Sequence, residues 1–559
     1  MKYSQALRIM EMDKKQYMMM LAASIIGMGI VAPLVMIVYL APFLEPLTLY
    51  TMLALPLFLT VVVIIWPIVL ASQRKIKIDR QMSWFVTEIA ALSTSDMSFD
   101  KIFYILSLKK EYGPLAEDAQ RIFRLVKQYN VSAAESCRFV AARSPSKMEN
   151  DFYSRLAHSI DVGEKLDRFM KNEHDIMMDE YVLKCEASLK DIDFLKEMFT
   201  GIITSLIFVC VFVAIIPLLG QTSVDYLMYG IIGGFAILEG AFVYLILSKV
   251  PKDDIWYPLR QKKKGGFLTD TDRILVVSVF IALLGSTVLA FFLLPLGLPW
   301  MLFASTVSLP ILIPGVLIFR EERKIENRDL VFGAFIRSLG RSSSVSGQTM
   351  AESVRKLALH KFGPLTNMVR NLSRRLAMHI NPRESWMHFA CETGSNTIKK
   401  FSSIYTQCVL SGSKPDATSM FISNNMFKIL AIRKKRVTIS SNFLGVLYGV
   451  AVALAFTMWV TVAITEYMSS TVSALDLGDT SAFGGGFLST MFNASYSVEP
   501  LKMMVVCVII IHAFFSSLML PLIKGGHIAT AAIHFVILVW IGALSGFIVD
   551  SMMAGLFSG

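Results

Sequence analysis

The chain has 559 residues, 54% of them hydrophobic, and a mean hydropathy of +0.56, far above the usual value for a soluble globular protein. Its formal net charge is +11, from 54 Lys and Arg residues against 43 Asp and Glu residues. These values argue against a soluble globular enzyme and favour a membrane protein with large charged segments outside the bilayer.

Long apolar runs predict about nine transmembrane helices. Each run can cross a hydrocarbon core about 30 Å thick at a rise of about 1.5 Å per residue. The fifth and sixth runs are separated only by Pro295, Gly297 and Pro299. The runs lie at 18–40, 47–71, 199–219, 226–248, 274–295, 298–319, 441–465, 501–523 and 528–549.

In chain order, two similar units follow one another, each with two spans, a polar domain and two more spans. The first unit comprises 1–71 with spans one and two, the polar domain 72–198, and 199–248 with spans three and four. A basic linker, 249–273, follows. The second unit begins with 274–319 (spans five and six), continues with the polar domain 320–440 and ends at 523 with spans seven and eight. A ninth span is appended to it, so that 441–559 holds spans seven to nine with an outer loop, 466–500. The order predicts parallel repeats.

A short motif marks the duplication inside the polar domains. Gly113-Pro114 and Gly363-Pro364 each precede a segment with the 3–4 spacing of an amphipathic helix, and each Pro is expected in the first helical turn. Capping signals at Ser132, Ser146 and Asn381, and the lack of period-2 alternation, predict an all-α fold with two helical-bundle domains. The charged stretches 164–198 and 415–440 are predicted to run as continuous helices into spans three and seven.

The charges predict an orientation. With a cytoplasmic N-terminus, nine spans place 53 of the 54 Lys and Arg residues on the cytoplasmic side. Lys502 is the exception and lies at a span end, where it can reach the interface. Both polar domains are then cytoplasmic and the C-terminus is outside. The first domain is nearly neutral, whereas 320–440 holds 21 basic and 8 acidic residues, a net of +13.

Catalytic motifs are not found. The sequence has no G-x-x-x-x-G-K-[ST] loop, no clustered His and Cys ligands and no G-x-S-x-G motif, so we expect no enzyme activity, no cofactor and no metal. The six Cys residues lie in spans or in the polar domains, and we expect reduced thiols.

Two ionisable residues fall inside predicted spans. Glu239 lies near the middle of span four and His512 near the middle of span eight, at equivalent places in the two halves. They could meet at the repeat interface as a proton relay or transport site. The alternative, which we favour, is a buried polar pair that locks the halves together.

Basic clusters divide into two groups. Those beside spans are explained by topology and by attraction to anionic lipid headgroups, worth about 1 kcal/mol per charge. Those far from any span, Arg374, Arg375, Lys399 and Lys400, predict a docking surface for an acidic protein, and nucleic acid is not expected because interleaved aromatic residues are sparse. The membrane-proximal residues are Lys262, Lys263, Lys264, Arg433, Lys434, Lys435 and Arg436.

Together these features resemble the F-domain family of type II and type IV secretion systems, the membrane platforms of secretion machines, pili and archaeal flagella. The resemblance rests on a Ser/Gly-rich turn (93–98; 342–347), the Gly-Pro motif, an amphipathic helix and a later Gly163 or Gly412, and it covers nearly the whole chain. Two domains and about nine spans are most similar to the archaeal flagellum (archaellum) branch, as is Gly525-Gly526-His527.

The resemblance implies a platform without catalytic residues. It would grip a hexameric secretion ATPase, work with pilin- or archaellin-like filament subunits, contact membrane lipids and form a homodimer or other homo-oligomer. Platforms of an archaeal adhesion pilus or of type II secretion are alternatives within the family. A secondary transporter with parallel repeats and a membrane scaffold without a motor partner are alternatives outside it.

Overall fold

The structure is a computed structural model of the chain. It describes residues 46–95, 97–219, 225–251, 253, 255–256, 270–346, 349–474 and 498–557, with Met19, Ala22, Ala23 and Ile25. Side chains are described from 69 onward in the first of these ranges. Within these residues every element of secondary structure longer than one residue is a helix. The one β-bridge among them pairs Trp256 with Ser395. The predicted all-α class is confirmed.

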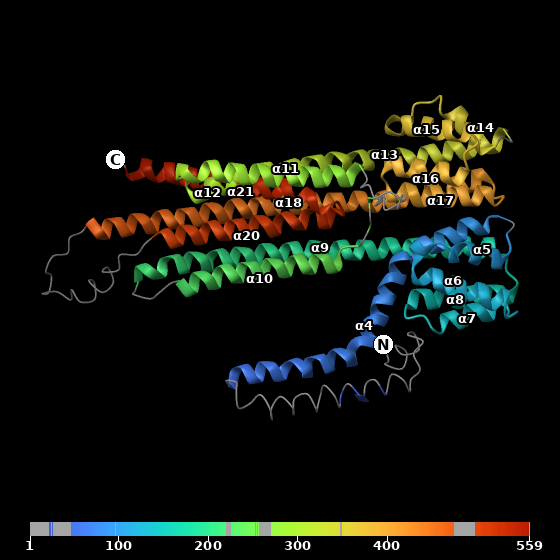
Figure 1. Cartoon of the computed structure of the whole chain (residues 1–559), viewed down its shortest axis with the longest axis horizontal. Helices are drawn as coiled ribbons and strands as arrows, with labels where there is room; N and C mark the ends of the chain where they lie inside the picture. The colour runs from blue at the N-terminus through green and yellow to red at the C-terminus, as the bar shows by residue number, and fades with distance from the viewer. Residues whose placement is uncertain are drawn as a thin grey trace. The chain divides into compact units, whose positions relative to one another are not determined.

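The two polar domains repeat one order of helices (Figure 1). In the first, α5 to α8 pack beside the end of α4. The elements are α4 (Pro46–Ser93), α5 (Phe99–Ser107), the short 3-10 helix η2 (Lys110–Tyr112), α6 (Pro114–Lys127), α7 (Ala133–Ala141), α8 (Lys147–Val162) and α9 (Leu166–Leu219).

The second polar domain follows the same plan, with α14 to α16 packed near the end of α13. The elements are α13 (Leu312–Ser346), α14 (Met350–Leu357), η5 (Gly363–Leu365), α15 (Thr366–Ala377), α16 (Pro382–Thr393), α17 (Asn396–Leu410) and α18 (Pro415–Ala474). The predicted duplication is therefore present helix by helix.

Seven helical segments are long and apolar enough to cross a membrane within the described residues. They correspond to predicted spans three to nine. Predicted span one lies almost entirely outside the described residues, and span two falls in α4 before its described side chains, so the number nine stays a prediction. The segments lie in α9, α10 (Asp225–Lys249), α11 (Asp270–Leu293), α12 (Trp300–Ser308) with α13, α18, α20 (Glu499–Lys524) and α21 (Ala531–Phe557).

The break between spans five and six is a tight turn, as Pro295, Gly297 and Pro299 predict. The 3-10 helix η3 (Leu294–Leu296) ends at Gly297, whose φ of +58° favours glycine. A second 3-10 turn, η4 (Leu309–Ile311), lies inside span six and contains Pro310, which cannot donate a helical hydrogen bond.

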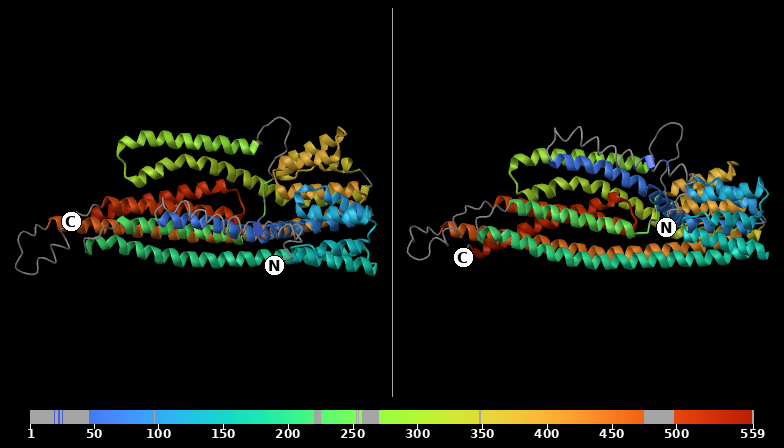
Figure 2. Two further views of the ribbon diagram at one scale, coloured as in Figure 1. Left: turned by 60° about the horizontal axis from the view of Figure 1, so that its bottom comes forward. Right: turned by 90° about the horizontal axis from the view of Figure 1, so that it is seen from below.

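Both predicted stalks are continuous helices, α9 and α18 (Figure 2). They have 54 and 60 residues, which corresponds to lengths of about 80 and 90 Å. Each begins in a polar domain and ends in a span, so a helix of each domain enters the apolar region without a hinge.

By its internal contacts the chain forms two compact units, residues 1–181 with 404–418, and residues 182–403 with 419–559. The core of the first contains Phe85, Phe103 and Phe152, all fully buried. In the second, Phe335, Trp386 and Phe389 fill the polar domain, with ring centroids 5.5–6.3 Å apart. A separate apolar core runs through α9, α10, α18, α20 and α21.

Two local predictions need correction. Pro114 opens α6 as predicted, but Pro364 lies in η5, and α15 begins two residues later at Thr366. At Ser146 the hydroxyl accepts from the Glu149 backbone N–H, yet the Glu149 carboxylate accepts from Ser144 instead of completing a capping box. A complete capping box is present at Thr349 and Glu352.

Candidate coupling site at the polar ends of the spans

In each polar domain an aromatic contact holds the Gly-Pro motif against the domain core. The residue before it stacks edge-to-face on a buried Phe, as Tyr112 on Phe85 at 5.5 Å and Phe362 on Phe335 at 5.3 Å between ring centroids. The glycines have φ of +54° at Gly113 and +51° at Gly363, which favours glycine. The repeat motif therefore positions the helix that follows it.

The second compact unit, residues 182–403 with 419–559, has a dense network of ion pairs where the second polar domain meets the spans. Arg433 on α18 lies at the centre. Its guanidinium donates to Asp253 at 2.6 Å, to Asp329 on α13 at 2.7 Å and to the Thr397 hydroxyl at 2.7 Å. One side chain thus joins α18, α13, the start of α17 and the residues that follow α10.

Burial and charge act in opposite directions on Asp253. Burial alone would raise the pKa of its carboxyl, but the Arg433 guanidinium outweighs that effect and holds the pKa below its usual value. Lys400 contributes in the same direction. The Asp253 carboxylate is therefore charged at neutral pH, which keeps Arg433 paired.

A second centre is Glu322 on α13, whose side chain is 1% exposed. Its carboxylate accepts from the His527 backbone N–H and from the Trp256 indole at 3.2 Å, and it lies 3.7 Å from the Lys524 ammonium. His527 lies in the turn between α20 and α21. Glu322 therefore ties α13 both to that turn and to Trp256, seven residues beyond the end of α10.

The two glycines in this turn are explained by close approach. A Cβ on Gly526 would lie 2.8 Å from a Glu322 oxygen, and a Cβ on Gly525 would lie 2.5 Å from an Arg436 nitrogen. Gly525 also has φ of +83°. Arg436, 2% exposed, donates to the Ile523 carbonyl at 3.1 Å, near the end of α20.

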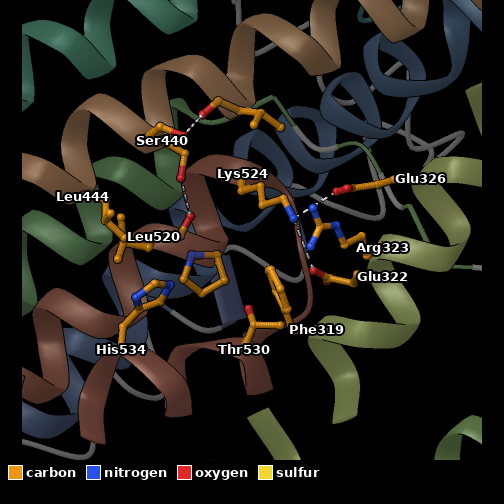
Figure 3. Close-up of a pocket in the computed structure, with 13 residues that line it drawn as sticks. Phe319, Glu322, Arg323, Glu326, Ser440, Leu444, Leu520, Lys524, Thr530 and His534 are labelled. Carbon is orange, nitrogen blue, oxygen red and sulfur yellow. Dashed lines mark hydrogen bonds and ion pairs between the residues drawn. The ribbon is translucent and has the colours of Figure 1, made fainter. Parts of the chain in front are cut away.

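A cavity of about 320 Å³ opens beside this turn (Figure 3). Its wall is apolar at Phe319, Leu444 and Leu520, and the Lys524–Glu326 ion pair of 2.9 Å lies at its rim. The cavity thus lies between α13, α18, α20 and α21, at the place where these helices are cross-linked by charge.

The four predicted docking residues differ in exposure. Arg374 is exposed on α15, but its neighbour Arg375 contacts Glu392 on α16. Lys399 and Lys400 are half-buried at the start of α17. Exposure, which the sequence pattern does not report, instead marks a set of five basic residues on α14, on α15 and in the segment between them, here called the basic face. It consists of Arg355, Lys356, Lys361, Arg370 and Arg374.

The membrane-proximal basic residues also differ from one another. Lys262, Lys263 and Lys264 lie outside the described residues. Arg433 and Arg436 belong to the internal network described above. Lys434 is exposed, and Lys435 pairs with Glu186 on α9, which joins the two stalks.

Glu239 on α10 and His512 on α20 do meet, with His512 Nδ1 2.5 Å from Glu239 Oε1. Both side chains are almost completely buried. Phe199 on α9 stacks on the imidazole with ring centroids 6.2 Å apart. The contact expected from their equivalent positions is present.

Comparisons with known proteins agree with this architecture. The family model "Type II secretion system (T2SS), protein F" matches twice, over residues 85–215 and 335–463. Each match covers one polar domain and the stalk that leaves it. Two matches in tandem are the duplication seen in the helices.

Two archaeal relatives are similar over nearly their whole length, although no solved structure matches the chain. Flagella accessory protein J of Methanococcus voltae is 33% identical over 528 residues, 92% of each chain. Flagella accessory protein J of Methanocaldococcus jannaschii is 30% identical over 512 residues, 89% of each chain. This chain belongs to the type II secretion system protein F family and is similar to two archaeal flagella accessory proteins J over 89–92% of its length.

Proposed function

We propose that the chain is the membrane platform of an archaellum or of a closely similar type IV-pilus-like machine, and that it transmits force between a cytoplasmic motor and the filament. The observation that carries this proposal is the coupling site. In the second unit, α13 and α18 run from the polar domain into the spans, and Arg433 and Glu322 tie their bases to the α20–α21 turn.

The coupling site gives force a route through the molecule. A displacement of the polar domain moves α13 and α18 as rods, because neither has a break at the level of the ion pairs. Buried charge pairs resist separation, since pulling them apart leaves a charge without compensation. Movement at the domain therefore reaches α20 and α21 instead of being absorbed by a flexible joint.

Sidedness follows from charge. Both polar domains lie on the side that carries 53 of the 54 Lys and Arg residues if nine spans are counted. The positive-inside rule supports a cytoplasmic position for that side. In this orientation the domains face the compartment where ATP is hydrolysed, and the C-terminus is outside.

We propose that the motor is a hexameric secretion ATPase that docks on the basic face of the second domain. All five residues of this face are exposed, and none of the ion pairs among the described residues involves them. Exposed charges without partners cost little to bring to a complementary acidic surface, and they accelerate encounter. The nearly neutral first domain supports asymmetric docking.

The test uses the full-length protein in detergent and the ATPase encoded in the same genome. Arg355→Glu combined with Arg370→Glu and Arg374→Glu is expected to reduce co-purification at physiological salt at least tenfold. Arg124→Glu is the matched control, because Arg124 is the equivalent of Arg374 in the first domain and is also exposed. Equal retention of the ATPase by the triple variant and the control would remove the second domain as the docking site.

A further inference from the structure

The contact between Glu239 and His512 leaves two polar atoms without a partner. Within the described residues, Glu239 Oε2 and His512 Nε2 are buried and make no hydrogen bond. The single polar contact of each side chain is thus the one between them. Because an unpaired buried charge is strongly unfavourable, the protonation of one group depends on that of the other.

The pair lies deep in the apolar region. Glu239 is ten residues before Lys249 at the end of α10, and His512 is twelve residues before Lys524 at the end of α20. At a rise of about 1.5 Å per residue both are about 15–18 Å from the polar ends of their helices. This depth corresponds to the middle of a core about 30 Å thick.

No other formal charge is near that depth on the helices that pack around the pair. The sequence has no further Asp, Glu, Lys or Arg in 199–215, 226–248, 441–465, 503–523 or 531–549. The remaining titratable side chains in these ranges are Cys210, Tyr226, Tyr229, Tyr244, Tyr448, Cys507 and His534. His534 already contacts the Tyr448 hydroxyl at 2.8 Å. The pair must therefore balance its own charge.

The Glu239–His512 pair can hold zero, one or two protons. Without a proton it is a carboxylate beside a neutral imidazole, and with two it is an imidazolium beside a neutral acid, so both states carry an isolated charge in the membrane. With one proton the pair is neutral overall, and a hydrogen bond joins the groups whichever of them holds the proton. Because burial disfavours an isolated charge, the state with one proton is the most stable of the three.

We infer that Glu239 and His512 form an intramembrane proton-binding clasp, which holds one proton and closes α10 of the first repeat on α20 of the second. The two helices are the last spans of their repeats before the appended α21. Gly240, next to Glu239, faces the Phe515 ring of α20, and a Cβ there would lie 3.6 Å from that ring, an ordinary van der Waals contact. The clasp thus joins the two halves of the molecule at mid-membrane depth.

The test is a double-mutant cycle on the thermal stability of the full-length protein in detergent. The variants are Glu239→Gln, His512→Gln, their combination, and the exchange of Glu239→His with His512→Glu. Each single change is expected to lower the Tm by several degrees. The combined variant should lose less than the sum, and the exchange should recover most of the loss, because it restores a one-proton pair.

Tyr448→Phe is the control, since it removes another intramembrane hydrogen bond, but one between α18 and the appended α21. It should not couple to Glu239→Gln. Additive losses from the two Gln changes, or an exchange variant no more stable than the combined Gln variant, would overturn the clasp.

The pH dependence tests the proton itself. In the unfolded chain Glu and His titrate near 4.3 and 6.5, so between these values that chain also holds one proton, and above about pH 6.5 it holds none. The difference in stability between wild type and the combined Gln variant should then be greatest between about pH 4.3 and 6.5 and fall as the pH rises. A difference that grows between about pH 4.3 and 6.5 and stays level above pH 6.5 would show a pair without a proton and refute the inference.

Discussion

Replacing Arg433 by Met should destabilise the coupling site more than any nearby surface change. The Arg433 side chain is 12% exposed and Asp329 is 1% exposed, so removing the guanidinium leaves two carboxylates near one another with little solvent. Removing one partner of a buried pair costs about 3–5 kcal/mol. Asp253 is 18% exposed and keeps part of its hydration, which favours the lower end of that range.

The assay is thermal unfolding of the full-length protein in detergent, together with protease sensitivity of the residues around Asp253. Both readouts should respond, because Arg433 holds that segment to α18. Lys434→Met is the control, since Lys434 is the exposed neighbour on the same helix. Asp329→Asn introduced into Arg433→Met should recover part of the loss by removing one uncompensated charge.

The reasoning would be refuted by an Arg433→Met protein with the Tm and protease pattern of Lys434→Met. In that case Arg433 would not restrain Asp253. A loss in Tm without greater cleavage near Asp253 would restrict the effect to α13 and α18.

Two other predictions concern single positions. Gly526→Ala should lower the Tm by disrupting the Glu322 contacts, since its Cβ would lie 2.8 Å from the carboxylate. Gly445→Ala is the control and should not lower the Tm, because nothing lies within 4 Å of a Cβ at that position. Equal Tm values for the two variants would contradict this prediction. Burial, aided by the neighbouring Asp118, raises the pKa of Glu149 to about 8, so wild-type stability falls as the pH rises from about 4.5 through 8. Glu149→Gln should remove that fall, and parallel Tm–pH curves for the two proteins would show that Glu149 does not cause it.

The duplication conserves packing and lets charge diverge. Asp79 on α4 accepts from the Ser146 hydroxyl, and Asp329 on α13 lies beside Ser395 in the second copy. Each Ser precedes the equivalent helix, α8 or α17. The two copies differ around this shared Asp–Ser contact, because in the second copy Asp329 also pairs with Arg433 in the coupling site. A shared fold thus supports two surfaces.

Much of this organisation can be predicted from the amino-acid sequence because it depends on local patterns. Apolar runs, 3–4 spacing and the paired Gly-Pro motif predict helices, spans and a duplication without knowledge of what they touch. The stalks are equally local, since α9 and α18 contain no breaker over the predicted junctions. The pairing of Glu239 with His512 was accessible as well, because equivalent places in a repeat tend to meet at its interface.

The coupling site was decided only by tertiary structure. Arg433 and Arg436 belong to a basic run beside a span, and nothing local separates them from Lys434 and Lys435. Folding brings Asp253 and Asp329, 180 and 104 residues away, to Arg433, and turns Arg436 toward α20. The physical reason is that spacing along a helix determines which face a charge occupies, whereas burial and partners depend on which distant segment covers that face.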